Sequence, residues 1–346
     1  MPLAPERISA GSYASRPIVL YMPFASGIVD ALEPARLRLL VEVERRGSIS
    51  AAAEACAVSQ PSATKQLKTL EAAIGEKLVE RNGRASRLTE AGEIVAAHAA
   101  RVLETLQGLQ EEIAALRGAE IGTLALAAST TPGAYVMPAI LQCFADRHPG
   151  VRVDIAVGSS SWVVDRVAKR EFSLGIAGEI ELPDGVTAEP FLDDELVGVA
   201  APGRIKLRRG KARADELARW TLLVRESGSS TQAVVDRALA RAGYRAANRW
   251  ELDSNEAIKR SIAAGLGIAF LSRLVVEDEI GRGELVSFRV EGIDPIRRSI
   301  YLLRPGDRDP TPAEMAFIGT LSDCCAVSIA GCASRPADAN QTELAT

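Results

Sequence analysis

The sequence predicts a multidomain chain of α + α/β class: an N-terminal winged helix-turn-helix, a long linker helix and a C-terminal two-lobed α/β domain. Three observations support this prediction. Residues 48–71 carry two helical patterns separated by a tight turn, residues 95–116 carry a heptad stripe, and strand and helix patterns alternate from about residue 122 onward.

Length and composition are consistent with this organisation. The chain has 346 residues, 47% of them hydrophobic and 25% charged, which suits two or three globular domains. No apolar run reaches the roughly 20 residues that span a bilayer. Residues 1–33 lack the pattern of an export signal, so we expect a cytoplasmic protein without membrane attachment. We interpret them as an extension that is either disordered or a misassigned start, with Met22 as an alternative initiator.

Cysteine and histidine usage argues against a disulfide framework or a metal site. The five cysteines form no C-x-x-C pair, and the vicinal Cys324–Cys325 pair is more often incidental packing than a redox or metal feature. His98 and His148 are the only histidines, so neither a histidine-based metal site nor a catalytic triad is expected. We therefore predict no cofactor and no metal.

Charge is unevenly distributed along the chain. The net charge is −4, yet residues 34–89 hold ten basic and six acidic side chains. A basic end on an acidic body fits a surface that contacts phosphates, although the signal is weak by itself.

Residues 34–92 carry the helix start and stop signals expected of a compact helical domain. A first helical face ends near Gly47, and Ser48 is expected to cap a second helix rich in small alanines, which let another helix approach closely. After a short connection at residues 56–58, Ser59 is expected to cap a third helix, whose first turn tolerates Pro61.

The third helix has two distinct faces. Ala63, Leu67, Leu70 and Ile74 form a narrow apolar stripe, while the opposite side carries hydroxyl, amide and lysine groups. Such a face can enter a DNA major groove, although an ordinary solvated surface is the alternative. A turn signal at Asn82-Gly83, surrounded by arginines, predicts a hairpin wing over the DNA backbone or minor groove.

Residues 47–92 resemble the winged helix-turn-helix of LysR-type transcriptional regulators. The matching segments are "SQPSATKQLKTLE", "GEKLVER" and "LTEAG", with Val79 where the family usually has Phe. The resemblance implies DNA contacts by the first turns of the third helix and by the wing. Combined with the geometry, the predicted DNA-binding residues are Ser59, Gln60, Pro61, Ser62, Thr64, Lys65, Lys68, Thr69, Arg81, Arg84 and Arg87.

Residues 93–120 are predicted to form a linker helix that dimerises. Its apolar positions, which include Ala99, recur at spacings of four and three, a seam typical of helix pairing; packing on its own domain is the alternative. The predicted dimerisation residues are Val95, Val102, Leu106, Leu109, Ile113 and Leu116. A dimer would bind approximately two-fold symmetric double-stranded DNA. The family resemblance implies homodimers and often homotetramers.

Residues 121–325 are predicted to form an α/β domain with parallel sheets in two lobes. We expect the first lobe to comprise about 121–200 and 270–305 and the second about 201–269, followed by a disordered tail at 326–346. Three segments in it, "MPAILQCFADRHPGVRVDIAVG", "VRESGSST" and "NEAIKRSIAAGLGIAFLS", are similar to the effector-binding domain of the same family. That domain is itself similar to periplasmic binding proteins.

Hydroxyl-rich loops follow three of the expected strands. At the carboxyl ends of parallel strands, loops and helix N-termini commonly bind polar or anionic ligands, although serines there are often only helix caps. The predicted effector-binding residues are Ser129, Thr130, Thr131, Ser159, Ser160, Ser227, Ser229 and Thr231. Many relatives carry a basic residue where Gln232 stands, which weakens the case for a doubly charged ligand.

The leading hypothesis is a sequence-specific DNA-binding regulator whose DNA binding or bending responds to a small polar or anionic effector between the lobes. A solute-binding protein, or a non-catalytic metabolite sensor that uses only the body domain, is the alternative. An enzyme is not expected, because neither a G-x-S-x-G elbow nor a P-loop is present.

Overall fold

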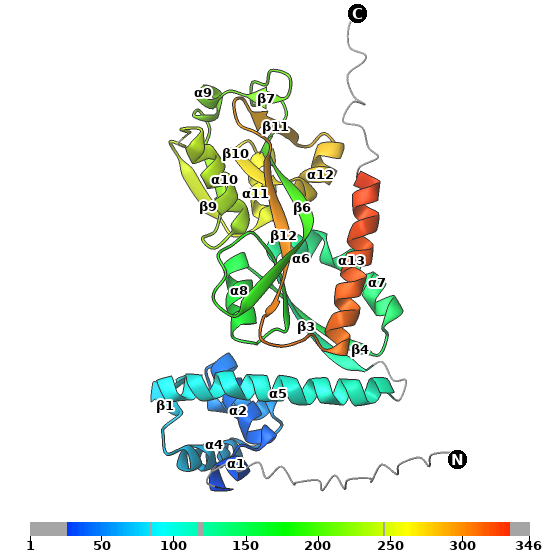
Figure 1. Ribbon diagram of the computed structural model, residues 1–346. Helices are drawn as coiled ribbons and strands as arrows, with labels where there is room; N and C mark the ends of the chain where they lie inside the picture. Colours follow the sequence, from blue (N-terminus) through cyan, green and yellow to red (C-terminus); the bar gives the residue numbers. More distant parts are fainter. Residues whose placement is uncertain (1–25, 83–84, 117–120, 245, 333–346) are drawn as a thin grey trace, which may run out of the picture. The chain divides into compact units, whose positions relative to one another are not determined.

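The computed structural model describes residues 26–82, 85–116, 121–244 and 246–332 (Figure 1). The chain divides into two compact units between Ala99 and Ala100. Helix α5 (Glu90–Leu116) contributes residues to both units.

The first unit is a three-helix core with a two-stranded wing. Its elements are α1 (Ser26–Ala31), α2 (Pro34–Arg46), α3 (Ile49–Ala55), α4 (Gln60–Ile74), β1 (Val79–Asn82) and β2 (Ala85–Leu88). Gly47 and Gly75 end α2 and α4 in the left-handed conformation that glycine adopts without strain. Ser59 caps α4 as expected, accepting a hydrogen bond from the Ser62 backbone N–H at 3.3 Å. The cap expected at Ser48 is not observed, because the Ser48 side chain accepts no hydrogen bond from a backbone N–H at the start of α3.

Small and large apolar side chains interlock in the core of this unit. Leu39, Leu40 and Val43 of α2 pack against Ala52 and Ala53 of α3 and the buried stripe of α4. The small alanine side chains permit this close approach of α3, which explains why the α3 segment carries alanines and almost no reactive side chains. Helix α1 lies within the region expected to be an extension, and Arg36 donates to the carbonyl oxygens of Asp30 and Ala31. Residues 1–25 lie outside the described part.

The second unit contains the end of α5 and the remaining elements. They are β3 (Gly122–Ser129), α6 (Thr130–Tyr135), α7 (Met137–Arg147), β4 (Val151–Gly158), α8 (Ser160–Ala168), β5 (Leu174–Gly178), β6 (Val186–Ala200), β7 (Lys211–Ala212), α9 (Ala214–Leu217), β8 (Leu222–Arg225), α10 (Ser230–Arg241), β9 (Arg249–Leu252), α11 (Asn255–Ala263), β10 (Ile268–Ser272), α12 (Arg273–Gly281), β11 (Val286–Val290), β12 (Ile296–Pro305) and α13 (Pro312–Cys332).

Two long antiparallel strands, β6 and β12, run side by side through this unit (Figure 1). The strand order is β4-β3-β5-β12-β6-β10-β8-β9, with β11 pairing to β6 as well. Neighbouring strands in each lobe, such as β3 with β4 and β8 with β9, are parallel. The sheet is therefore mixed, whereas the sequence predicted parallel sheets.

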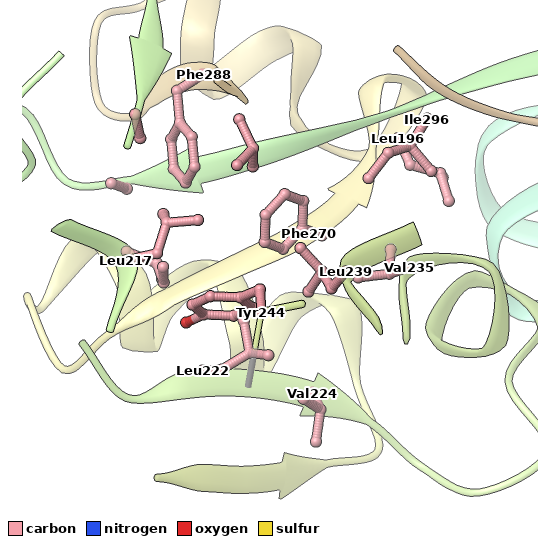
Figure 2. Close-up of a cluster of buried hydrophobic side chains, with 14 of the residues drawn as sticks. Leu196, Leu217, Leu222, Val224, Val235, Leu239, Tyr244, Phe270, Phe288 and Ile296 are labelled. Carbon is pink, nitrogen blue, oxygen red and sulfur yellow. The ribbon is translucent and has the colours of Figure 1, made fainter. Parts of the chain in front are cut away.

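The boundary between the lobes differs from the expected division. Phe270 of β10 and Phe288 of β11 pack edge to face at 5.8 Å, in one buried cluster with Leu222 and Leu239 (Figure 2). Residues 268–290 therefore belong to the core of the second lobe, and the chain returns to the first lobe only along β12. The first lobe has its own core, in which Leu124, Phe144 and Phe317 are buried.

The C-terminal region also departs from expectation. Helix α13 extends to Cys332, so residues 326–332, expected in a disordered tail, are helical, while 333–346 lie outside the described residues. Within the described part, no helix is long and apolar enough to cross a membrane.

Candidate nucleic-acid interface and ligand cleft

Helix α4 presents the polar face that the sequence predicts. Ser59, Gln60, Pro61, Lys65, Lys68 and Thr69 are exposed, and Ser62 and Thr64 are half-buried. The hydroxyls of Thr64 and Thr69 donate to the carbonyl oxygens of Gln60 and Lys65 on the preceding turn, at 3.0 Å each. No carboxylate among the described residues forms a salt bridge with Lys65 or Lys68, so both ammonium groups can contact phosphates.

The wing is an antiparallel hairpin of β1 and β2. Arg87 is exposed on β2 and stands opposite Glu80. Arg81 pairs with Ser86 in the backbone register, while Arg84 lies in the part of the turn outside the described residues. The described part of the hairpin thus exposes one basic side chain, Arg87, as expected of a wing that contacts the DNA backbone.

Replacing Lys65 by alanine is expected to weaken DNA binding and to lower the slope of log affinity against log salt by about 0.9, because one phosphate contact is lost. Lys77→Ala is the matched control, since Lys77 is equally cationic and exposed but precedes the wing. Fluorescence anisotropy across a salt series measures both variants. An unchanged slope in Lys65→Ala, or an equal effect in Lys77→Ala, would remove Lys65 from the interface.

The hydroxyl-rich loops of the second unit converge on one cavity between the lobes. Seven of the eight residues predicted to bind an effector line it: Ser129, Thr130, Thr131, Ser159, Ser160, Ser229 and Thr231. The eighth, Ser227, lines a neighbouring surface groove of about 370 Å³ instead. The cavity thus forms where α8 and α10 begin, and their free N–H groups favour an anion.

Hydrogen bonds close this cavity across the two lobes. The Ser160 hydroxyl donates to the Ser230 hydroxyl at 3.0 Å, and the Ser161 N–H donates to the Gly228 carbonyl oxygen at 3.3 Å. A Cβ on Gly228 would lie 2.2 Å from the Ser161 Oγ, so glycine permits this close approach. The space that remains is about 10 Å³, roughly that of one water.

Arg225, at the end of β8, is one of two buried arginines at the cavity. It is 4% exposed, and its guanidinium donates to Asn255 Oδ1 at 2.6 Å and to Glu226 at 2.7 and 2.8 Å. Its Nη2 also donates to the Thr130 hydroxyl in the opposite lobe at 3.3 Å. Gln232, where many relatives are basic, accepts from the Arg225 backbone N–H at 3.0 Å.

Arg298, on β12, is the second buried arginine. It donates to Asp194 Oδ2 at 2.9 Å and to the hydroxyls of Ser230 and Thr231 at 2.9 and 2.8 Å. Burial lowers the pKa of the Arg298 guanidinium, and the Asp194 carboxylate opposes that shift. Ser272 donates to the other oxygen of Asp194 at 2.7 Å, so both carboxylate oxygens accept a hydrogen bond, whereas Arg298 Nη2 lies 2.9 Å from Asp194 Oδ2 as an ion pair without hydrogen-bond geometry.

Four further lining residues are not among those predicted from the sequence: Arg225, Glu226, Ser230 and Arg298. A signal for both arginines exists, because each interrupts an apolar strand pattern in "LLVRE" and "IRRSIYLL". A charged residue inside a buried strand usually has a charged partner or binds a ligand, so this pattern indicates both arginines as candidate site residues.

The C-terminal part of α5 has an apolar side and a polar side. Val102, Leu106, Leu109, Ile113 and Leu116 are all exposed in the single chain, and Leu109 is 51% exposed. Val95, at the start of the same predicted stripe, instead packs partly against the core of the first unit. The apolar stripe from Val102 onward therefore has no cover among the described residues of this chain.

The polar side of α5 is held against the first lobe by charged groups. Glu104 Oε2 accepts from Arg170 at 2.6 Å, and Glu111, which is buried, accepts from the Thr123 N–H at 3.3 Å. Burial raises the pKa of the Glu104 carboxyl against the lowering effects of Arg308 and Arg170. These contacts fix which side of the helix faces the lobe and leave the stripe outward.

A winged helix-turn-helix, an outward helical stripe and a two-lobed domain with a polar cleft define a ligand-responsive DNA-binding regulator. Residues 34–93 match the bacterial regulatory helix-turn-helix protein, lysR family, and residues 117–326 match the LysR substrate binding domain. The chain belongs to the LysR family of DNA-binding transcriptional regulators. Membership of this family confirms the predicted family and the predicted function of a non-catalytic DNA-binding transcriptional regulator. It does not support the solute-binding or enzyme alternatives.

Known relatives agree with this assignment. The chain is 31% identical over 283 residues to the RuBisCO operon transcriptional regulator of Acidithiobacillus ferrooxidans, covering 82% of this chain and 91% of the relative. Full-length OxyR from Pseudomonas aeruginosa shares the fold, with a TM-score of 0.68, 23% identity and coverage of 85% and 94%. The regulatory domain of CcmR from Synechocystis PCC6803, in complex with 2-PG, has a TM-score of 0.55 and 29% identity; the match covers 59% of this chain and 97% of that domain.

Proposed function

We propose that the cleft between the lobes binds a small anion of the phosphorylated carboxylic acid class, such as 2-PG. The observation that carries the proposal is the convergence, on one cavity at the N-termini of α6, α8 and α10, of seven predicted hydroxyl-bearing residues and two buried arginines. Hydroxyls, guanidinium groups and free N–H groups are the usual donors to phosphate and carboxylate oxygens. The CcmR regulatory domain, which is similar to this domain, binds 2-PG.

Ligand entry requires the lobes to separate. A space of about 10 Å³ does not admit a phosphorylated acid, so the contacts of Ser160 with Ser230 and of Thr130 with Arg225 must open. The ligand then replaces these inter-lobe hydrogen bonds with its own oxygens. Because it binds the open arrangement better than the closed one, it shifts the population between the two.

Titration with 2-PG tests this site. We expect 2-PG to raise the melting temperature of the full chain, and Arg225→Met to weaken its binding by about 10-fold or more, since a charge-assisted contact is worth about 1.5–3 kcal/mol. Arg219→Met is the matched control, because Arg219 is an exposed arginine of the same lobe away from the cavity. Isothermal calorimetry measures both. Equal affinity in Arg225→Met and the wild type would contradict the proposed site.

We further propose that two chains pair through the α5 stripe and read an approximately two-fold symmetric DNA site, with tetramers as a further assembly. The exposed heptad positions support pairing, because an apolar stripe of this length is normally covered. The residues of the α4 face and the wing then contact DNA in both half-sites. Similarity to regulators of RuBisCO operons favours genes of carbon fixation as targets, and a cytoplasmic location, where that DNA lies.

A further inference from the structure

Arg225 is paired at the ligand cavity with a carboxylate of its own chain. Its Nε donates to Glu226 Oε2 at 2.7 Å, and its Nη2 donates to Glu226 Oε1 at 2.8 Å. These two parallel bonds use the Nε–Nη2 edge of the guanidinium, with which arginine binds carboxylates and phosphates alike. Among the described residues, Glu226 is the carboxylate that forms a salt bridge with this buried cation. The donors that suit an anionic ligand are therefore occupied in the closed arrangement of the lobes.

Glu226 lies in the wall between the cavity and the surface groove beside it. Arg225, Glu226 and Ser229 line both the cavity of about 10 Å³ and the groove of about 370 Å³. The Glu226 side chain is 23% exposed, whereas the Arg225 side chain is 3% exposed. The carboxylate can therefore turn toward water in the groove, while Arg225 Nη1 remains bound to Asn255.

A donor beside the Arg225 guanidinium has no partner. Asn255 accepts from Arg225 Nη1 through Oδ1, and its Nδ2 is buried without a hydrogen-bond partner among the described residues. Buried side-chain donors are nearly always paired, and an exception often marks the place of a bound water or ion. An anion on Arg225 would bring an acceptor close to this donor.

We propose that Glu226 is an internal competitor of the ligand. In the closed cleft its carboxylate occupies the Nε–Nη2 edge of Arg225, and an entering anion takes over that edge while Glu226 turns into the groove. This inference rests on the cleft being the anion site proposed above. A buried arginine needs a counter-charge, and Glu226 supplies it until the ligand does.

The exchange favours ligands that carry more than one anionic group. A simple monocarboxylate replaces the Glu226 carboxylate by an identical group and gains no contact at Arg225. A phosphorylated acid has a second anionic group, which can bind free N–H groups at the start of α8 or α10. Competition by Glu226 therefore selects against monocarboxylates.

Calorimetry of 2-PG binding to Glu226→Gln tests the proposal, since glutamine keeps the shape of the side chain and removes its charge. We expect this variant to bind 2-PG about 10-fold more tightly than the wild type, because no like charge is displaced or left beside the ligand. Glu251→Gln is the matched control and should bind as the wild type does, because Glu251 is exposed and lines the groove but not the cavity.

The sign of the change separates competition from a purely structural role. If Glu226 only holds Arg225 in position, Glu226→Gln should bind 2-PG more weakly than the wild type. Binding in Glu226→Gln that is equal to or weaker than wild-type binding would overturn the proposal and would leave the cleft as the anion site.

Melting curves with inorganic phosphate test the same exchange without 2-PG, with sodium chloride at equal ionic strength as the baseline. Glu226→Gln should melt below the wild type, because its buried Arg225 lacks a counter-charge. Phosphate should raise the melting temperature of Glu226→Gln more than that of the wild type, and Arg225→Met/Glu226→Gln should lose this difference. Equal stabilisation of Glu226→Gln and the wild type would overturn the proposal. A phosphate difference without 2-PG binding would support the exchange and refute 2-PG as the ligand.

Discussion

Replacing Arg298 by methionine is expected to lower the free energy of unfolding of the second unit by about 3–5 kcal/mol, because it leaves the Asp194 carboxylate buried without its cation. Both side chains are almost fully buried and lie 2.9 Å apart. Urea unfolding followed by tryptophan fluorescence measures the effect in that unit alone, since Trp162, Trp220 and Trp250 all lie in it.

Two variants show whether the loss comes from the unpaired charge. Arg297→Met removes an exposed arginine from the same strand and should change stability by no more than about 0.5 kcal/mol. The double variant Asp194→Leu/Arg298→Met removes both charges and should recover most of the stability, as apolar replacements of buried ion pairs often do. A double variant no more stable than Arg298→Met would mean that hydrogen bonds to Ser230, Thr231 and Ser272 carry the effect instead.

Replacing Leu109 by glutamate is expected to convert the proposed α5-paired dimer into monomers and to lower affinity for a two-half-site DNA by about 10²-fold or more. A charge in the middle of the α5 stripe would face its symmetric copy in an apolar seam. Each recognition helix then binds alone and loses the effective concentration that the partner supplies. Sedimentation velocity gives the assembly state, and a mobility shift gives the DNA affinity.

Gln110→Glu is the control for this experiment. It adds the same charge one residue further along α5, at an exposed position outside the stripe. It should leave both the sedimentation coefficient and DNA affinity near those of the wild type. If Leu109→Glu remains a dimer, the stripe is not the pairing surface; if it is monomeric yet binds DNA normally, pairing does not support recognition.

The fold was predictable where local patterns decide it. The spacing of Ala63, Leu67 and Leu70 predicted the buried side of α4, and glycines and prolines marked the helix ends. The lobe boundary was not predictable in the same way, because it depends on the long-range packing of Phe270 against Phe288 rather than on any local signal.

The residues of the candidate cleft were likewise predictable only where a local pattern marks them. Hydroxyl-rich loops at strand ends are a local signal, and seven of those residues line one cavity. Arg298 comes from a strand that returns from the other end of the unit, so only the three-dimensional pairing of β6 with β12 places it beside Asp194 and Ser230. Arg298 was not predicted because its partners lie far from it in the sequence, not because of its residue type.

One titration tests the central claim that ligand binding in the cleft changes the complex with DNA. A fragment from upstream of the protein's own gene, labelled at both ends with a donor and an acceptor dye, is titrated with the full chain with and without saturating 2-PG. We predict a shift in the midpoint of about 5-fold or more, or a changed energy-transfer plateau that reports altered bending, with neither change in Arg225→Met. Identical midpoints and plateaus with and without bound 2-PG would contradict the account.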